Sequence, residues 1–151
     1  MTDDLKLFDY WPYHNRPKIK WPNDAKIAFW VAPNIEFYEL DPPSNPHRKP
    51  WPKYSPDVTG YSIRDYGNRV GHMRQMKLLD KYKIRGSISL SAALCDHHPE
   101  IIKMCHERNW EFFSHGVYNT RYTYGLSEDQ EREMILDAFE TIEKHTGKGP
   151  A

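Results

Sequence analysis

The sequence predicts an α/β fold built on parallel strands. Three stretches of strand length, residues 26–32, 87–91 and 110–114, are separated by segments with the spacing of amphipathic helices. The first stretch is apolar without alternation, which is typical of a strand buried on both faces of a parallel sheet. Strands that alternate with helices form parallel sheets with right-handed crossovers. In such folds, ligands bind at the carboxyl ends of the strands.

Three helices are expected around these strands. The first opens at Tyr66 and spans residues 66–82, where apolar residues recur at helical spacing. The second begins at Pro99, since proline suits the first position of a helix. The third has the strongest signals, because Ser127 and Gln130 form a capping box and Gly147 is the expected stop.

Two segments rich in proline and aromatic residues lie outside this pattern. Residues 1–25 predict an extended arm held by its aromatic side chains, since proline fixes φ and removes a backbone donor. Residues 41–60 form a long Pro-rich loop, and such loops are often lids or binding loops. A linker is the alternative, but Trp51 and nearby tyrosines favour an ordered loop.

Composition and charge exclude several classes of protein. The 21 basic residues balance the 21 acidic ones, which argues against a nucleic-acid surface. No apolar run is long enough to span a bilayer and the first residues lack a signal sequence, so we expect no membrane contact and a cytoplasmic location. Cys95 and Cys105 are expected to be free thiols. The apolar fraction of 38% is low, which fits a chain that needs a partner surface.

Polar residues gather where the first and third predicted strands end. His115 directly follows the third strand, and Glu36 lies just past the first. A histidine there can act as a metal ligand, a general acid or base, or a hydrogen-bond donor to a carbonyl. Glu36 can act as an acid, a base or a ligand. The alternatives are a satisfied core histidine and a solvated carboxylate, and we favour the catalytic interpretation for both residues, most clearly for His115.

Four further residues are candidates for substrate binding. Asn34, which is also expected past the first strand, and Asn119 offer both a donor and an acceptor to a polar substrate, although turn formation explains them equally well. Arg69 could hold a carboxylate or carbonyl through its fork, and a salt bridge at the helix start is the equal alternative. Tyr118 could form a wall of the pocket, or simply pack.

Five short motifs occur together in a specific order. They are Asn34-Ile35-Glu36, Tyr66-Gly67-x-Arg69-x-Gly71, His98-Pro99-Glu100, Ser114-His115-Gly116 and Thr146-Gly147-Lys148-Gly149-Pro150. In this order and spacing, the chain from about residue 20 onward resembles the polysaccharide-deacetylase superfamily, and within it the branch of the cofactor-independent allantoinase and the cyclic-imide hydrolases. The resemblance implies a distorted (β/α) barrel and hydrolysis of an amide-type C–N bond.

The chain departs from the usual metal site of the superfamily it resembles. Members carry an Asp-Asp pair after the first strand, one residue as base and one as ligand, and a His-x-x-x-His motif after the third strand. Here the pair is replaced by Asn34-x-Glu36, and Asn119 stands four residues past His115. The resemblance therefore implies no standard metal site. A zinc site rebuilt from His115, Glu36 and a third ligand remains the alternative.

The resemblance also implies that the barrel is incomplete. Residues 26–151 would form the first three β/α units, and three strands cannot close a barrel. We therefore expect a second polypeptide or a C-terminal half to complete it, and an oligomer. The expected function is hydrolysis of a C–N bond in a small amide, imide or ureide. The alternatives are a metal-dependent deacetylase of an N-acetylated sugar and a non-catalytic binding subunit.

Overall fold

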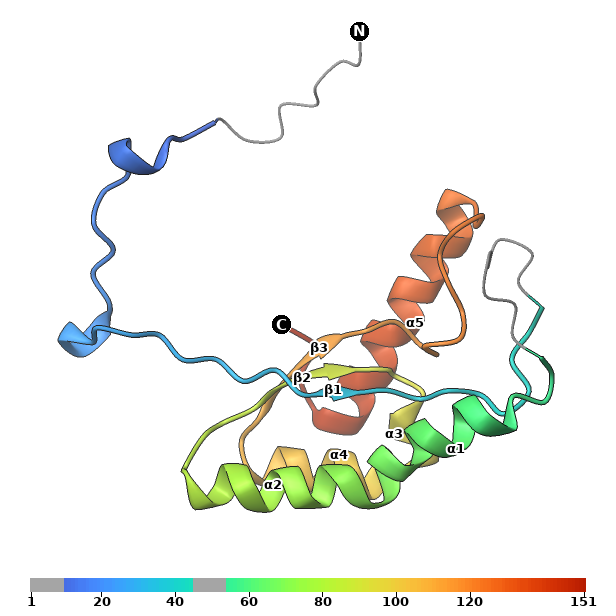
Figure 1. Cartoon of the computed structure of the whole chain (residues 1–151). Helices are drawn as coiled ribbons and strands as arrows, with labels where there is room; N and C mark the ends of the chain where they lie inside the picture. Colours follow the sequence, from blue (N-terminus) through green and yellow to red (C-terminus); the bar gives the residue numbers. More distant parts are fainter. Residues whose placement is uncertain (1–9, 45–53) are drawn as a thin grey trace, which may run out of the picture.

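The computed structural model describes residues 10–44 and 54–151. Within these ranges three parallel strands form one sheet in the order β1-β2-β3 (Figure 1), which confirms the predicted α/β fold with parallel strands. The strands are β1 (Asn34–Ile35), β2 (Ser87–Leu90) and β3 (Glu111–Ser114). The helical elements are η1 (Tyr13–Asn15), η2 (Pro22–Asp24), α1 (Val58–Tyr66), η3 (Gly67–Gly71), α2 (His72–Lys81), α3 (Leu94–His97), α4 (Pro99–Glu107) and α5 (Glu128–Thr146).

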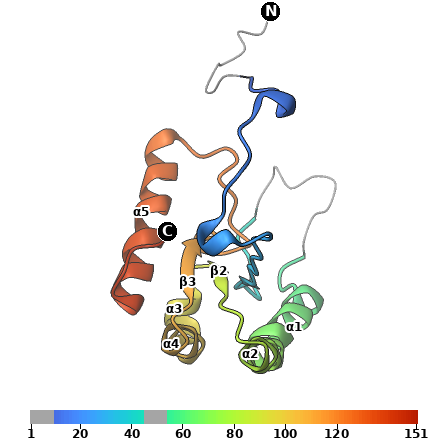
Figure 2. The same cartoon turned by 90° about the vertical axis from the view of Figure 1, so that its left-hand side faces the viewer.

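Helices α1 to α4 lie on one side of the sheet, α5 lies beside β3, and the chain before β1 leaves on the side opposite α1 to α4 (Figures 1 and 2). The hydrophobic core lies between β2, β3 and these helices. Its fully buried members include Ile88, Leu90, Ile101 and Ile142. Helices α1 to α4 therefore cover one face of the sheet and leave its carboxyl edge for polar residues.

The backbone ladder continues one step past the assigned ends of the strands. The amide of Ser91 donates to the Ile35 carbonyl at 3.0 Å, and the amide of His115 donates to the Leu90 carbonyl at 2.8 Å. Glu36 follows Ile35 directly. The three strands thus end at the same level, with one polar residue after each.

The prediction of a buried first strand over residues 26–32 is wrong. Ile27, Phe29 and Trp30 are 79%, 75% and 69% exposed, and only Val31 forms an isolated bridge to the start of β2. The reason is that this segment lies at an edge of the sheet, where the described chain supplies a neighbouring strand on one side only. Asn34, expected past the strand, lies within β1.

The first helix begins earlier than predicted. Opening at Tyr66 is wrong, because α1 already begins at Val58, where the Asp57 side chain accepts a hydrogen bond from the Gly60 amide at 2.8 Å and caps the helix. The helical path then continues through η3, a single π turn, into α2. The predicted loop is therefore shorter than residues 41–60, and its part with Trp51 lies outside the described residues.

The other helix predictions are confirmed. Helix α4 begins at Pro99. The Ser127 side chain accepts from the Gln130 amide and the Gln130 side chain from the Ser127 amide, which completes the capping box of α5, and Gly147 ends it with φ of 73°. Cys95 and Cys105 are buried free thiols, as predicted. Among the described helices, none is long and apolar enough to cross a membrane.

The described part of the predicted arm, residues 10–25, is extended apart from the single turns η1 and η2. Tyr10 and Tyr13, which were expected to hold the arm in place, are 90% and 87% exposed. Residues 1–9 lie outside the described ranges. The arm therefore finds no packing surface for these two side chains in the described chain.

Candidate active site

The extended segment from Asn34 to Tyr38 separates a polar side from an apolar side. Successive side chains of an extended chain point to opposite faces. Ile35 and Phe37 are only 1% and 9% exposed and belong to the core. Asn34, Glu36 and Tyr38 therefore share the other face, at the carboxyl edge of the sheet.

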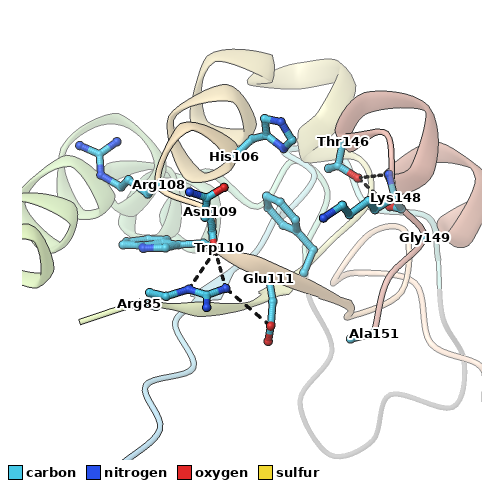
Figure 3. Close-up of a pocket in the computed structure, with 11 residues that line it drawn as sticks. Arg85, His106, Arg108, Asn109, Trp110, Glu111, Thr146, Lys148, Gly149 and Ala151 are labelled. Atoms are coloured by element: carbon cyan, nitrogen blue, oxygen red, sulfur yellow. Dashed lines mark hydrogen bonds and ion pairs between the residues drawn. The ribbon is translucent and has the colours of Figure 1, made fainter. Parts of the chain in front are cut away.

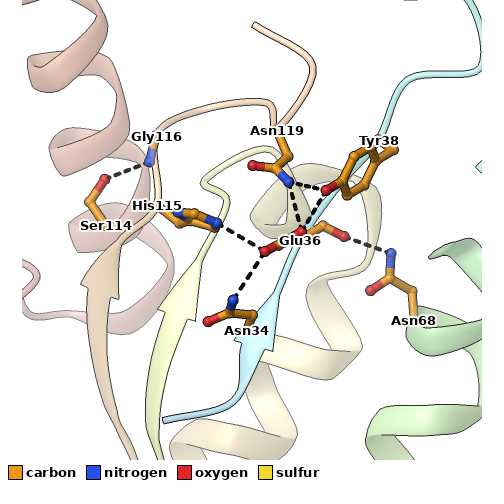
Figure 4. Close-up of polar contacts among 8 residues, drawn as sticks. All are labelled: Asn34, Glu36, Tyr38, Asn68, Ser114, His115, Gly116 and Asn119. Carbon is orange, nitrogen blue, oxygen red and sulfur yellow. Dashed lines mark hydrogen bonds and ion pairs between the residues drawn. The ribbon is translucent and has the colours of Figure 1, made fainter. Parts of the chain in front are cut away.

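Glu36 is the centre of the polar cluster in Figure 4. Its Oε1 lies 2.9 Å from Nε2 of His115 and accepts from Nδ2 of Asn34 at 3.2 Å. Its Oε2 accepts from the Tyr38 hydroxyl at 2.9 Å and from Nδ2 of Asn119 at 2.7 Å, and the Asn119 amide also contacts the Tyr38 hydroxyl. With a neutral imidazole donating from Nε2, all four acceptor positions of the carboxylate are used. The Glu36 side chain therefore orients the four side chains around it.

Backbone contacts hold the members of this cluster in place. The backbone N–H of Asn119 donates to the Phe37 carbonyl at 3.0 Å. The side chain of Asn68 donates through Nδ2 to the backbone carbonyl of Glu36 at 3.1 Å. After His115 the chain turns at Gly116, whose φ of 75° is readily adopted by glycine. The Gly116 carbonyl accepts from the amide of Ala92 at 2.9 Å. The chains that follow β1, β2 and β3 are thus tied together at the site.

His115 combines a fixed nitrogen with an open one. Its Nε2 faces Glu36, and in the described part of the chain its Nδ1 makes no hydrogen bond. The His115 side chain is 37% exposed, against 21% for Glu36. Imidazole takes up and releases protons near neutral pH, and a carboxylate on one nitrogen fixes the tautomer that leaves the other nitrogen as an acceptor. This arrangement suits a general acid and base.

Tyr38 belongs to the site although sequence reasoning missed it. Burial raises the pKa of its phenol, and the neighbouring Glu36 carboxylate raises this pKa further. The Arg64 guanidinium, 4.2 Å from the ring centre, lowers the pKa, but the net shift is upward. The phenol therefore stays protonated and can donate to Glu36. The alternation Asn34-x-Glu36-x-Tyr38 could have identified it, whereas no local signal pointed to Asn68.

Tyr118 lies beside the cluster without a hydrogen bond to Glu36 among the described contacts. Its ring packs edge-on against Phe37 at 5.9 Å, and its hydroxyl lies 3.3 Å from Nε2 of His97. The His97 ring stacks on Phe37 at 4.0 Å, and the Arg121 guanidinium covers the Tyr118 ring at 4.2 Å. Tyr118 is therefore part of an aromatic wall next to the polar cluster.

Arg69 lies apart from the polar cluster. Its Nε forms an ion pair with Asp65, four residues earlier, and the Arg69 side chain is 65% exposed. Nε2 of His98 lies 3.8 Å from the other oxygen of Asp65. The geometry matches the salt-bridge interpretation of Arg69, and the structure gives it no contact with Glu36 or His115.

The donor set does not fit a divalent metal. Glu36 and His115 are the one carboxylate and the one imidazole of the cluster, and Glu36 already accepts from two amides and a phenol. Within residues 10–44 and 54–151, no group of three His, Cys, Asp or Glu side chains could hold a metal ion. The third ligand of the rebuilt zinc site is therefore not found in this part of the chain.

A separate cavity of about 670 Å³ lies at the opposite end of the sheet (Figure 3). It is lined by residues around the start of β3, including Arg85, Trp110 and Glu111. Arg85 donates to the Asn109 carbonyl at 2.8 Å and lies 3.7 Å from Glu111, so its charge is already engaged. None of the predicted site residues lines this cavity. The candidate site therefore remains the cluster at the carboxyl edge.

The chain is similar to a known protein family and to several solved structures. A family model for polysaccharide deacetylase matches residues 60–151. A solved structure described as a probable polysaccharide deacetylase from Pseudomonas aeruginosa PAO1 is 26% identical, with a TM-score of 0.74 over 99% of this chain and 52% of that one. A solved PuuE allantoinase is 23% identical, with a TM-score of 0.70 over 95% of this chain and 52% of that one. No curated protein matches the chain.

The chain thus spans about half the length of each of these two solved structures. Its three parallel strands correspond to part of their fold, which confirms the predicted partial fold of this type. At 23% identity, the similarity to the allantoinase shows a shared fold and nothing about activity. The family model, in contrast, covers more than half of the sequence, and the chain therefore belongs to the polysaccharide deacetylase family.

Proposed function

We propose that this site hydrolyses a C–N bond in a small amide, imide or ureide. The observation that carries the proposal is the cluster in which Glu36 lies 2.9 Å from one nitrogen of His115 and the other nitrogen is open. The family match adds support, because hydrolysis of an amide-type bond is the reaction in the name of a deacetylase. His115 is the proposed catalytic residue, and Glu36 acts by orienting it.

In the proposed reaction, Nδ1 of His115 takes a proton from the water molecule that attacks the substrate carbonyl. The resulting tetrahedral intermediate breaks its C–N bond, and the same nitrogen returns the proton to the leaving nitrogen. Glu36 stabilises the imidazolium that exists between the two transfers. This scheme uses no metal ion, in keeping with the donor set of the cluster.

The two asparagines of the cluster favour imides and ureides as substrates. Asn34 and Asn119 both donate to Glu36 through Nδ2. Their Oδ1 atoms accept no hydrogen bond from described residues and remain acceptors. Imides and ureides carry N–H groups next to the scissile carbonyl, which match such acceptors. Asn34 and Asn119 are therefore the proposed substrate-binding residues.

We also propose that further polypeptide beside β3 completes the site, either a C-terminal half or a second chain. The Ala151 amide donates to the Phe112 carbonyl at 2.9 Å. The same direction of bonding joins β2 to the segment before β1, where the Ser87 amide donates to Val31. Ala151 therefore occupies the position from which a further parallel strand can pair with β3. The added polypeptide would supply the donors for the negative oxygen of the intermediate.

A hydrolysis screen tests these proposals. The full chain is incubated with succinimide, hydantoin, allantoin and simple amides, alone and mixed with a polypeptide that covers the second half of the fold. Release of ring-opened product or ammonia by the mixture is expected, and its loss in His115→Ala. His106→Ala, an exposed histidine of α4, is the matched control. Unchanged turnover in His115→Ala refutes its role, and full activity of a monomer of this chain alone refutes the need for completion.

The deacetylase of an N-acetylated sugar is the second candidate, because the family model carries that description. It would require a metal ligand set that the described residues do not provide. Metal analysis of the purified protein separates the two candidates. One tightly bound zinc per chain, together with acetate release from N-acetylglucosamine oligomers, would replace the imide proposal. Tight binding of an imide without turnover would instead favour a non-catalytic binding subunit.

A further inference from the structure

The contact between Glu36 and His115 joins two strands that are not neighbours. β2 lies between β1 and β3 in the sheet. Because adjacent strands are about 4.8 Å apart, the backbones of β1 and β3 are separated by roughly 10 Å. The two side chains nevertheless meet at 2.9 Å, and Figure 4 shows their contact passing over the end of β2. The pair therefore closes over one residue of the central strand.

That residue is Ser91. Two positions earlier, Ser89 is paired in register with Asn34 of β1 and with Phe113 of β3. Residues two apart on a strand point to the same face, so the next row across the sheet contains Ser91 between the bonded glutamate and histidine. The ladder bond from the Ser91 amide to Ile35, at 3.0 Å, shows that the pairing reaches this row.

Burial limits what the Ser91 side chain can do. Ser91 is 0% exposed, and in the described structure its hydroxyl oxygen has no hydrogen-bond partner. A fully buried hydroxyl cannot attack a substrate, which excludes a nucleophile. An unpaired buried hydroxyl lowers stability by about 1–3 kcal/mol, so hydrogen bonding does not explain the residue either. Its remaining property is its small size.

We infer that Ser91 is a positioning residue, whose small side chain allows Glu36 and His115 to meet across β2. A β-branched side chain in this place adds methyl groups below the contact and forces the carboxylate and the imidazole apart. Alanine or cysteine in place of Ser91 leaves the space below the Glu36–His115 contact nearly unchanged. This role of Ser91 sets the geometry of the Glu36–His115 pair and does not depend on which reaction the site catalyses.

Histidine-selective ¹⁵N NMR of the full chain tests this inference at pH 9, where an ordinary imidazole is neutral. In the wild type and in Ser91→Ala, the His115 signals should show one tautomer, with the proton on Nε2. In Ser91→Val they should show a mixture of both tautomers. Ser87→Val is the matched control, because Ser87 lies on the same face at the other end of β2. It should leave the His115 signals unchanged.

The variants distinguish the size of the Ser91 side chain from its hydroxyl group. Unchanged His115 signals in a folded Ser91→Val variant would overturn the inference. A mixture of tautomers in Ser91→Ala would assign the role to the hydroxyl and overturn the argument from size. If circular dichroism shows that Ser91→Val does not fold, Ser91→Thr, which adds a single methyl group, takes its place with the same readout. A crystal structure of either variant should show Nε2 and Oε1 more than 3.5 Å apart, beyond the usual range of a hydrogen bond.

Discussion

Replacing Glu36 with glutamine tests the central claim that this carboxylate holds the site together. The side chain keeps its shape but loses its charge and exchanges one acceptor oxygen for an NH₂ group. Oε1 faces Asn34 and His115, and Oε2 faces Tyr38 and Asn119. Either orientation of the glutamine therefore points its NH₂ group at a pair of groups that donate to the carboxylate.

The magnitude follows from the bonds that are lost. A hydrogen bond to a charged group contributes about 1.5–3 kcal/mol, so losing two of them gives an upper range of about 3–6 kcal/mol. The real cost is smaller, because Glu36 is 21% exposed and the Tyr38 hydroxyl can turn to accept from the new NH₂ group. We expect a loss of about 2 kcal/mol in the free energy of unfolding, and therefore a fall in Tm of about 4–8 °C for a chain of this size.

Urea denaturation followed by circular dichroism at pH 7 measures this loss on the full chain. Glu107→Gln is the control, because Glu107 is exposed and lies 4.0 Å from Lys103 in an i,i+4 pair, worth no more than about 0.5 kcal/mol. If Glu36→Gln unfolds at the same urea concentration as the control, the four contacts do not act together and the reasoning is refuted. A changed slope of the transition would instead indicate altered compactness.

Three further predictions use other parts of the chain. Ser127→Ala should lower stability by about 1 kcal/mol through loss of the cap of α5, seen in a thermal melt. Burial raises the pKa of Glu39, but the hydrogen bonds from Arg121 and Thr120 and the nearby positive charge of Arg121 together outweigh it and hold the pKa below its ordinary value of 4.5. The stability advantage of the wild type over Arg121→Gln should therefore be full above pH 4.5 and disappear as the pH falls through the lowered pKa, measured by urea denaturation at several pH values. Burial raises the pKa of Cys95 and Cys105 to about 12, so Ellman's reagent should react with both only after unfolding; fast reaction of the native chain would contradict this.

The parts of the fold that local chemistry decides were predictable. The ends of α5 depend on Ser127, Gln130 and Gly147, which act within a few residues of their own positions. The burial of Ile27 and Phe29 depends instead on what lies beyond an edge of the sheet. An apolar strand-like sequence carries no information on whether the chain itself supplies that neighbour, and here the described chain does not.

The candidate site shows the same division. His115 and Glu36 were predicted together because the carboxyl ends of parallel strands meet at one edge, and the structure places them in contact. Asn119, predicted as a substrate-binding residue, also contacts Glu36. Asn68 was missed because its contact with Glu36 spans 32 residues and depends on the path of a helix. The sequence allowed Arg69 either to bind a ligand or to form a salt bridge at the helix start. The structure shows the ion pair with Asp65, four residues earlier, which favours the salt bridge.

The π turn η3 has a consequence for the rotational phase of the helical segment that contains it. The His72 amide bonds to the Gly67 carbonyl, five residues earlier, so this turn holds one more residue than an α-helical turn. Since an α-helix rotates by about 100° per residue, every later side chain is displaced around the axis by about that angle. Met76 and Leu79 can therefore face the core while Asn68 faces Glu36. Removing one residue other than Asn68 from this turn would convert it into an ordinary α-helical turn and leave Asn68, Met76 and Leu79 facing as they do now.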